Sequence, residues 1–239
     1  QMNINLKVIL AFIYIICLCT LLYSVFSYLD LKDLTSYAFI KDNTQILINY
    51  KNNNIFLLII LFFLGSILWV FMLGFGSPIC ILSGFLFGHW AGTLISVTSL
   101  TLGSSFLYFF SRYYFADLIT KRLSGKIIKY KHLFNKNEFF YFMAFRFAGG
   151  AGIPFAIQNI IPVVFNMKLK NYFYATLFGL VPSVFIINTL GNGIENIIKN
   201  NDQVDLKSFL LNPEIYWPVI GFISIMFISH LIKLKIFKK

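Results

Sequence analysis

The most constraining feature of this sequence is a run of 57 residues, 55–111, that contains no charged side chain. As one straight helix rising 1.5 Å per residue it would measure about 85 Å, almost three times the thickness of a bilayer core. The run must therefore turn. Shorter charge-free runs at 8–29, 171–194 and 215–232 each approach or exceed the length of one crossing. The sequence predicts an all-α polytopic membrane protein.

The composition agrees with this class and argues against others. The 239 residues are 58% hydrophobic and 12% charged, whereas soluble domains are nearer half apolar and a quarter charged. The basic residues behind the net charge of +11 stand between the apolar runs, which favours a role in membrane topology over nucleic-acid binding. The three cysteines and three histidines have neither disulfide nor zinc-ligand spacing, so we expect no metal and no cofactor.

Glycines and prolines indicate where the two longest apolar stretches turn. Residues 74–78, Gly-Phe-Gly-Ser-Pro, end a crossing over about 55–73, and the helix that ends at Arg112 then begins near residue 92. Too few residues lie between these crossings for two more, so we predict a re-entrant hairpin over 78–90, shielded by protein. The residues expected to shape the hairpins or break the helices in both halves are Pro78, Gly84, Gly88, Gly103, Gly179 and Pro182, of which Gly103, Gly179 and Pro182 lie within crossings.

A second apolar stretch, 139–167, is also too interrupted for a straight helix. A glycine cluster at 149–152 is followed by Pro154, and such a pattern disfavours a helix interior. Its length fits a second hairpin before a crossing over about 172–190. With the terminal crossings, about 8–28 and 215–232, we expect about five transmembrane helices and two hairpins.

The distribution of charge predicts the topology. Basic residues in 116–137, at 168 and 170 and in the C-terminal tail mark the cytoplasmic side, and the acidic loop 192–213 then lies outside. The hairpins consequently enter from opposite faces. Both 25-residue spacings, from Pro78 to Gly103 and from Pro154 to Gly179, agree with an inverted repeat.

The chain divides into three expected parts. Residues 1–54 form an N-terminal anchor and a polar connection with a short interfacial helix over 37–50. Residues 55–200 form the core, and 201–239 a loop, a last crossing and a basic tail. Within the core, residues 116–137 suit a helix lying on anionic headgroups, or else a cytoplasmic loop whose lysines only set the topology.

Arg146 is the sharpest candidate for a binding residue. A cation deep in an apolar stretch costs about 2.5–3.5 kcal/mol on insertion scales, so it pairs with another group or faces water. The acidic residue before it, Glu138, is eight positions earlier. A guanidinium suits a phosphate, which N–H groups of Gly149, Gly150 and Gly152 could share. Alternatively, Arg146 donates to carbonyls of the opposed hairpin and locks it.

Other polar residues in apolar segments are weaker candidates. Arg112 stands at an expected helix end, where snorkelling to the interface competes with binding. Asn159 and Asn188 suit interhelical hydrogen bonds or the lining of a cavity. Pro154 is expected to shape the backbone. The candidate substrate-binding residues are therefore Arg112, Arg146, Gly149, Gly150, Gly152, Pro154, Asn159 and Asn188.

An ordered set of residues over about 65–200 also resembles a known family. Its members in the first half are Pro78, Ser83, Gly84, Gly88, Gly92, Thr101, Gly103 and Arg112, and in the second half Arg146, Phe147, Gly152, Pro154, Phe155, Asn159, Ala175, Thr176, Gly179, Pro182, Gly191 and Gly193. The set resembles the DedA/VTT-domain superfamily and is similar in particular to its SNARE-associated Golgi protein branch of bacterial integral membrane proteins. The resemblance implies two re-entrant hairpins and a role in lipid scrambling or flipping, in recycling of polyprenyl-phosphate carriers, or in membrane homeostasis.

The sequence departs from the family pattern at several positions. Val163 and Ser183 stand where glycine is usual. The proton-coupled DedA branch has acidic residues near its first hairpin, whereas residues 77–79, Ser-Pro-Ile, offer none. A proton-driven mechanism is therefore not carried over to this chain.

We expect a multi-pass protein of the inner (plasma) membrane, with a cytoplasmic C-terminus, that moves anionic lipids or lipid-carrier phosphates across the bilayer. Its partners would be membrane lipids and not nucleic acid, and a homo-oligomer is compatible with the sequence. An ion- or proton-coupled small-solute transporter and a non-transporting scaffold for lipids or partners stay open as alternatives. The sequence has no Walker lysine and no His-Glu-x-x-His motif, so we do not expect an enzyme.

Overall fold

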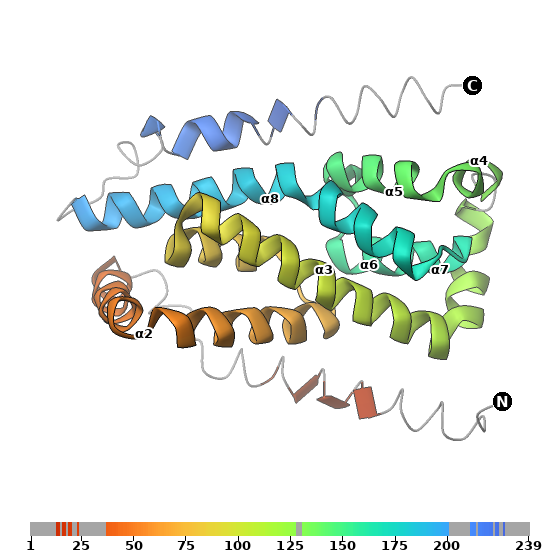
Figure 1. Ribbon diagram of the computed structural model, residues 1–239, viewed down its shortest axis with the longest axis horizontal. Helices are drawn as coiled ribbons and strands as arrows, with labels where there is room; N and C mark the ends of the chain where they lie inside the picture. Colours follow the sequence, from red (N-terminus) through yellow and green to blue (C-terminus); the bar gives the residue numbers. More distant parts are fainter. Residues whose placement is uncertain are drawn as a thin grey trace. The chain divides into compact units, whose positions relative to one another are not determined.

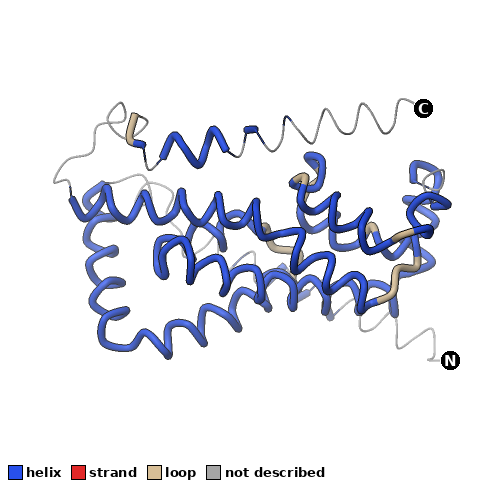
Figure 2. Tube along the Cα trace, turned by 45° about the horizontal axis from the view of Figure 1, so that its top comes forward, coloured by secondary structure: helices blue, strands red, loops and turns tan. Residues whose placement is uncertain are grey.

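The computed structural model describes residues 37–127, 131–200, 211–213 and 215–221, with short pieces at 13–14, 16–17, 19–20, 23, 223–224 and 227. These residues lie in helices and the turns between them, and no strand occurs in these ranges (Figure 2). The predicted all-α class is confirmed for this part of the chain. The chain divides into two compact units, Gln1–Ile55 and Phe56–Lys239.

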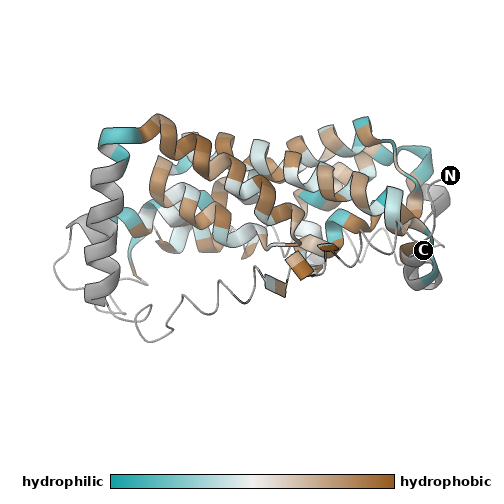
Figure 3. Ribbon diagram, turned by 90° about the horizontal axis from the view of Figure 1, so that it is seen from below, coloured by the Kyte–Doolittle hydropathy of each residue, from teal (hydrophilic) through white to brown (hydrophobic). Residues whose placement is uncertain are grey.

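Three helical segments in the described ranges are long and apolar enough to cross a bilayer: Asn53–Phe71, Gly76–Asp117 and Leu169–Asn196. Hydrophobic residues predominate along these helices (Figure 3). Most of the predicted first crossing and most of the second half of the predicted last crossing fall outside the described residues, and the total of five crossings stays a prediction.

Helix α2 (Tyr37–Phe71) contains the predicted short helix and the first crossing of the core. Its helical backbone is interrupted at Asn54, with φ −141° and ψ 41°. The helix ends where Leu73 adopts a left-handed φ of 64°, a conformation typical of helix C-termini. The amide of Gly74 then donates to the Trp69 carbonyl over 2.9 Å and closes the last turn.

Helix α3 (Gly76–Ile127) folds back on itself at Gly88, where φ is 77° and ψ is 175°. Ser83 Oγ donates to the Gly92 carbonyl over 3.0 Å, although these residues would lie about 13 Å apart along a straight helix. The short arm before Gly88 therefore lies against the long helix after it (Figure 1). Gly88 breaks the helix as predicted.

The prediction that the helix after Gly88 ends at Arg112 is wrong, because α3 continues to Ile127. Residues 112–124 contain neither glycine nor proline, so nothing in the backbone stops the helix there. The rings of Phe110 and Tyr114, one turn apart, lie 4.6 Å from each other across this region. The first part of the predicted surface segment 116–137 is thus a continuation of α3.

The second half of the core repeats this order of elements. Two turns have a left-handed residue, Gly149 with φ 65° and Asn166 with φ 59°. The first turn separates a helix from a short arm, residues 155–165, and the second separates this arm from a long helix. The turns at Leu73 and Gly88 separate the corresponding elements of the first half. The elements are α4 (Lys131–Lys136), α5 (Glu138–Phe147), the 3₁₀ turn η3 (Gly149–Gly152), α6 (Phe155–Ile160), α7 (Pro162–Phe165) and α8 (Leu169–Asn200).

A close contact between two helices recurs in the two halves with an offset of 76 residues. In each half, a Cβ atom added to a glycine of the long helix would lie 2.8 Å from a carbonyl oxygen and less than 3 Å from a Cβ atom of the preceding helix. The absence of a side chain therefore permits both pairs of helices to touch closely. The two sets are Gly103 with Ile67 and Val70, and Gly179 with Met143 and Arg146.

Most of the glycines and prolines expected to shape the hairpins and helices lie inside helices. Gly84, Gly103 and Gly179 are interior residues at close contacts, and a Cβ on Gly84 would lie 2.0 Å from the Asn188 carbonyl. Helix α8 also continues through Pro182, as membrane helices do where neighbouring groups can satisfy the freed carbonyl. Pro78 lies in the first turn of α3, where its missing N–H is tolerated.

Candidate functional site

Arg146, in the last turn of α5, is the most deeply buried cation in the described part of the chain, with 1% of its surface exposed. Aromatic rings lie close to its guanidinium group. The guanidinium carbon is 5.0 Å from the Phe142 ring centre and 5.1 Å from that of Phe155, within the range of cation–π attraction. These rings exclude water from the charge that they contact.

The guanidinium group donates hydrogen bonds to three neutral side chains. Nη1 donates to Gln158 Oε1 over 3.0 Å, and Nη2 donates to Asn159 Oδ1 and, over 3.2 Å, to the Tyr172 hydroxyl. Helix α6 supplies both amides, and α8 supplies the tyrosine. The prediction that Arg146 needs partners is therefore confirmed, but these partners leave its positive charge uncompensated.

The partners of Arg146 are themselves held in place. Gln158 Nε2 donates to the Ile153 carbonyl over 2.6 Å, and the Tyr172 hydroxyl donates to the Ser104 carbonyl over 3.3 Å. A Cβ on Gly150, whose φ is 71°, would lie 2.0 Å from Gln158 Nε2. The glycine cluster therefore leaves room for Gln158 to reach the guanidinium.

Two buried N–H donors of the site have no hydrogen-bond partner in the described structure, Arg146 Nε and Asn159 Nδ2. Arg146 and Asn159 are bonded to each other, so the unsatisfied donors belong to one cluster. A buried donor without a partner costs about 1–3 kcal/mol. The arrangement therefore has spare donors and a net positive charge, which is a combination suited to an oxyanion.

Arg112 is connected to this cluster through two tyrosines. Arg112 Nη1 donates to the Met167 carbonyl over 2.8 Å, and the Tyr108 hydroxyl donates to the same oxygen. The Tyr108 ring stacks on Tyr172 with centres 4.4 Å apart, and Tyr172 bonds Arg146. Arg112 thus holds the turn before α8, and snorkelling alone does not describe it.

The structure separates Asn188 from the other predicted site residues. It follows Tyr172 by 16 residues along α8, which corresponds to about 24 Å. Its Nδ2 donates to the Val184 carbonyl over 2.9 Å, and its backbone packs against Gly84. Asn188 thus lies at the contact between α8 and the short arm of α3.

The remaining predicted residues lie in the backbone before α6. Pro154 caps this helix, and its carbonyl accepts from the amides of Ile157 and Gln158. Gly149 and Gly152 have left-handed φ angles of 65° and 77° and open space at their Cβ positions. Pro154 shapes the backbone as predicted, whereas ligand binding by the glycine N–H groups stays a prediction.

Sequence reasoning missed Gln158, Tyr172 and Tyr108. The pair Gln158-Asn159 in an otherwise apolar stretch was a usable signal, because consecutive amides there need partners. The tyrosines gave no such signal, since tyrosine is common at the ends of membrane helices. As for metals, no group of three or more His, Cys, Asp or Glu side chains that could hold an ion occurs in the described ranges.

The chain is similar to known proteins over the segment that contains this site. Residues 73–193 match the VTT domain. The uncharacterized protein YqeD of Bacillus subtilis (strain 168) is 30% identical over 115 residues, which are 47% of this chain and 54% of that protein. The transmembrane protein 41 homolog of Dictyostelium discoideum is 26% identical over 174 residues, 70% of this chain and 51% of that protein. The chain spans about half the length of these relatives, and no solved structure matches it.

Proposed function

The chain belongs to the VTT-domain family of membrane proteins, and we propose that it transports anionic lipids or lipid-carrier phosphates between the two leaflets of the bilayer. Membership of the family supports a role in membrane transport or homeostasis. The choice of an anionic lipid as substrate rests on the chain's own residues around Arg146.

The observation that carries this proposal is the pair of unpaired donors at a buried charge. Arg146 Nε and Asn159 Nδ2 have no acceptor among the described residues, and the three side chains hydrogen-bonded to the guanidinium are neutral. In a low-dielectric interior an uncompensated cation and two unsatisfied donors are all unfavourable. A phosphate oxygen removes these penalties together, because it supplies a negative charge and several acceptor positions.

Because Arg146 is almost completely buried, a lipid headgroup can reach it only after the surrounding helices move. With 1% of its surface exposed and rings of Phe142 and Phe155 beside it, the guanidinium is closed off in this conformation. In the proposed cycle α5 or α6 shifts, a lipid phosphate replaces the missing acceptors, and the acyl chains stay in the surrounding bilayer.

The proposed architecture has about five crossings and two opposed re-entrant hairpins. The two short arms support it, since the Phe155 ring at the start of α6 lies 3.6 Å from the Cβ position of Gly76 at the start of α3. The constant offset of 76 residues between the halves also supports a duplicated unit. In the proposed orientation the C-terminus and residues 168–170 lie on the cytoplasmic face of the inner (plasma) membrane.

Reconstitution into liposomes tests this function. The full chain and its Arg146→Gln variant would be compared for transbilayer movement of a fluorescent anionic phospholipid, measured by chemical quenching in the outer leaflet. Wild-type protein should accelerate the movement, and Arg146→Gln should lower the rate at least tenfold, because the amide lacks the charge that phosphate binding needs. Arg146→Lys should retain part of the rate, and circular dichroism and monodisperse gel filtration should show that both variants fold.

The result also separates the alternatives. Lipid movement unaffected by Arg146→Gln in a folded protein would contradict the proposed site. Uptake of a soluble ion without lipid movement would favour the small-solute transporter. Wild-type protein that accelerates neither process would favour a scaffold.

A further inference from the structure

A polar pocket of about 420 Å³ lies where α4, α5, α7 and α8 come together. Lys136, Glu138, Asn166, Lys168 and Asn171 are among the residues that line it. The pocket adjoins the start of the apolar segment Leu169–Asn196, which is long enough to cross a bilayer. It therefore lies at the end of a candidate membrane span, the depth at which lipid headgroups are found.

The charges in the pocket favour an anion. The Glu138 carboxylate already accepts from the Lys168 amide over 3.2 Å and from Asn171 Nδ2 over 2.6 Å, so it is occupied in capping the start of α8. Lys136 and Lys168 both line the pocket and are exposed, so the lining residues carry two positive charges against this one negative charge. Two lysines with neighbouring amide side chains suit the phosphate of a lipid headgroup.

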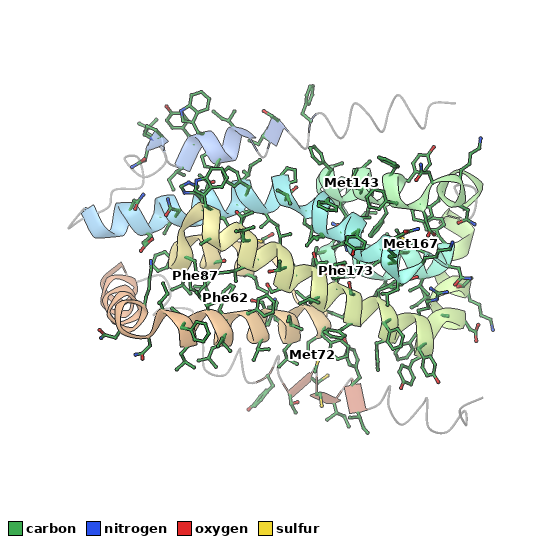
Figure 4. The ribbon with its side chains drawn as sticks, in the orientation of Figure 1. Phe62, Met72, Phe87, Met143, Met167 and Phe173 are labelled. Atoms are coloured by element: carbon green, nitrogen blue, oxygen red, sulfur yellow. The ribbon has the colours of Figure 1, made fainter. Side chains whose placement is uncertain are left out.

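The first half of the core has an apolar residue at the position that corresponds to Glu138. Seventy-six residues before Glu138 stands Phe62. The ring of Phe62 meets that of Phe87 edge-on, with centres 5.4 Å apart (Figure 4). Phe62 thus packs against another ring, whereas its counterpart Glu138 lines a hollow together with lysines and amide side chains.

The pocket is linked to Arg146 by a short series of contacts. Lys168 follows Met167, whose carbonyl accepts from Arg112 and Tyr108. Tyr108 stacks on Tyr172, and Tyr172 bonds the guanidinium of Arg146. A phosphate in the pocket is therefore separated from the buried site by the Met167 turn and the stacked tyrosines.

We propose that this pocket is an outer subsite that binds the phosphate of a membrane phospholipid before the headgroup reaches Arg146. The inference rests on the function proposed above. Lys136 and Lys168 attract the phosphate at the membrane boundary, and the stacked tyrosines separate this subsite from the buried one. Binding in the pocket determines the anionic lipid fraction at which movement is half-maximal, while Arg146 determines the maximal rate of lipid movement.

The test measures lipid movement in liposomes with increasing fractions of anionic phospholipid. Lys136→Gln and Lys168→Gln should each raise the half-saturating lipid fraction about fivefold, which corresponds to the loss of one lysine–phosphate attraction near a membrane surface. Their maximal rates should match the wild type. Lys170→Gln is the matched control, because Lys170 is exposed at the same boundary but does not line the pocket. It should shift the half-saturating fraction twofold at most.

Each outcome decides a different point. Unchanged half-saturation in the Lys136 and Lys168 variants, or an equal shift in Lys170→Gln, overturns the subsite. Inhibition of lipid movement by soluble inorganic phosphate at concentrations similar to those of the lipid would assign the pocket to free phosphate and overturn the lipid assignment. Arg146→Gln separates the two proposals. A wild-type maximal rate in this variant contradicts the proposed function. A lowered maximal rate in this variant, together with unchanged half-saturating lipid fractions in the Lys136 and Lys168 variants, contradicts only the subsite.

Discussion

The two halves of the core place different residues at the same position of the same framework. Val70 and Arg146 are 76 residues apart, and each packs its Cβ against a glycine of the following long helix, Gly103 or Gly179. Both are buried. The close helix contact is therefore independent of the side chain chemistry beyond Cβ, and the second half has a cation where the first half has a small apolar group.

The surroundings of the two residues explain why each is tolerated. Arg146 has two amides and a hydroxyl within hydrogen-bond distance. Val70 is packed in a cluster whose other buried members are Ile79, Cys80, Val97, Leu100, Leu180 and Val184. The two positions therefore differ in their surroundings: apolar residues of both halves surround Val70, whereas two amides and a hydroxyl surround Arg146.

Exchanging the two side chains gives the largest expected effect. Val70→Arg buries a cation among apolar residues and should lower the free energy of unfolding by about 3 kcal/mol or more. Arg146→Val should remove lipid movement while the protein still inserts into membranes. Thermal unfolding in detergent and the liposome assay measure the two effects. Arg146→Val should also lose stability, because the buried Gln158 and Asn159 oxygens lose their donor. Full lipid movement in a folded Arg146→Val variant, or unchanged stability in Val70→Arg, would contradict the difference between the halves.

An alanine at each packing glycine sharpens the comparison. Gly103→Ala and Gly179→Ala should each lower stability by about 1–3 kcal/mol, because the added methyl group overlaps a backbone carbonyl in both halves. Gly179→Ala should also slow lipid movement, since its methyl group displaces Arg146. The ratio of transport loss to stability loss is the quantity to compare. If this ratio is the same for both variants, the glycine at 179 has no special relation to the site.

The turns that precede the short arms differ in strain. Leu73 and Gly149 have nearly equal φ angles, 64° and 65°, but only glycine adopts this region without a steric penalty. Gly149→Ala should therefore destabilise the protein by about 1 kcal/mol, and Leu73→Gly should stabilise it by a smaller amount. Chemical denaturation in detergent can detect both changes, and a stabilising Gly149→Ala would show that the two turns are not equivalent.

The smallest effect is expected at Arg112. Arg112→Gln removes one of two donors to the Met167 carbonyl and should cost less than about 1 kcal/mol, because Tyr108 still donates to that oxygen. Tyr108→Phe combined with Arg112→Gln leaves the buried carbonyl without either donor and should cost more than the sum of the single changes. Strict additivity in a double-mutant cycle would show that the two residues act independently.

The sequence predicted the relation between the halves better than the role of each glycine. The equal spacings from Pro78 to Gly103 and from Pro154 to Gly179 indicated a repeated unit, since they depend only on residue positions. Whether a glycine breaks a helix or permits a close contact depends on the helix that faces it. Gly88 breaks α3, whereas Gly103 does not, and only the fold distinguishes them.

The candidate site was also predicted in part. Arg146 stood out because a cation in an apolar stretch is unfavourable without a partner. Asn159 was a candidate as well, but its pairing with Arg146 was not predictable, because Gln158, Asn159 and Tyr172 reach the guanidinium from two other helices. Arg112 was expected at a helix end, but α3 continues past it and its side chain bonds the turn before α8.

Direct contact between Arg146 and a lipid phosphate is the central claim, and solid-state NMR of the protein in phospholipid bilayers can measure it. The chain has three arginines, Arg112, Arg122 and Arg146, so ¹⁵N-arginine labelling gives few guanidinium signals, and Arg146→Lys identifies the one that belongs to Arg146. The account predicts ³¹P–¹⁵N dipolar coupling to the Arg146 signal in bilayers that contain anionic phospholipid. Coupling confined to Arg112 and Arg122, with the Arg146 signal unaffected by ³¹P, would contradict it.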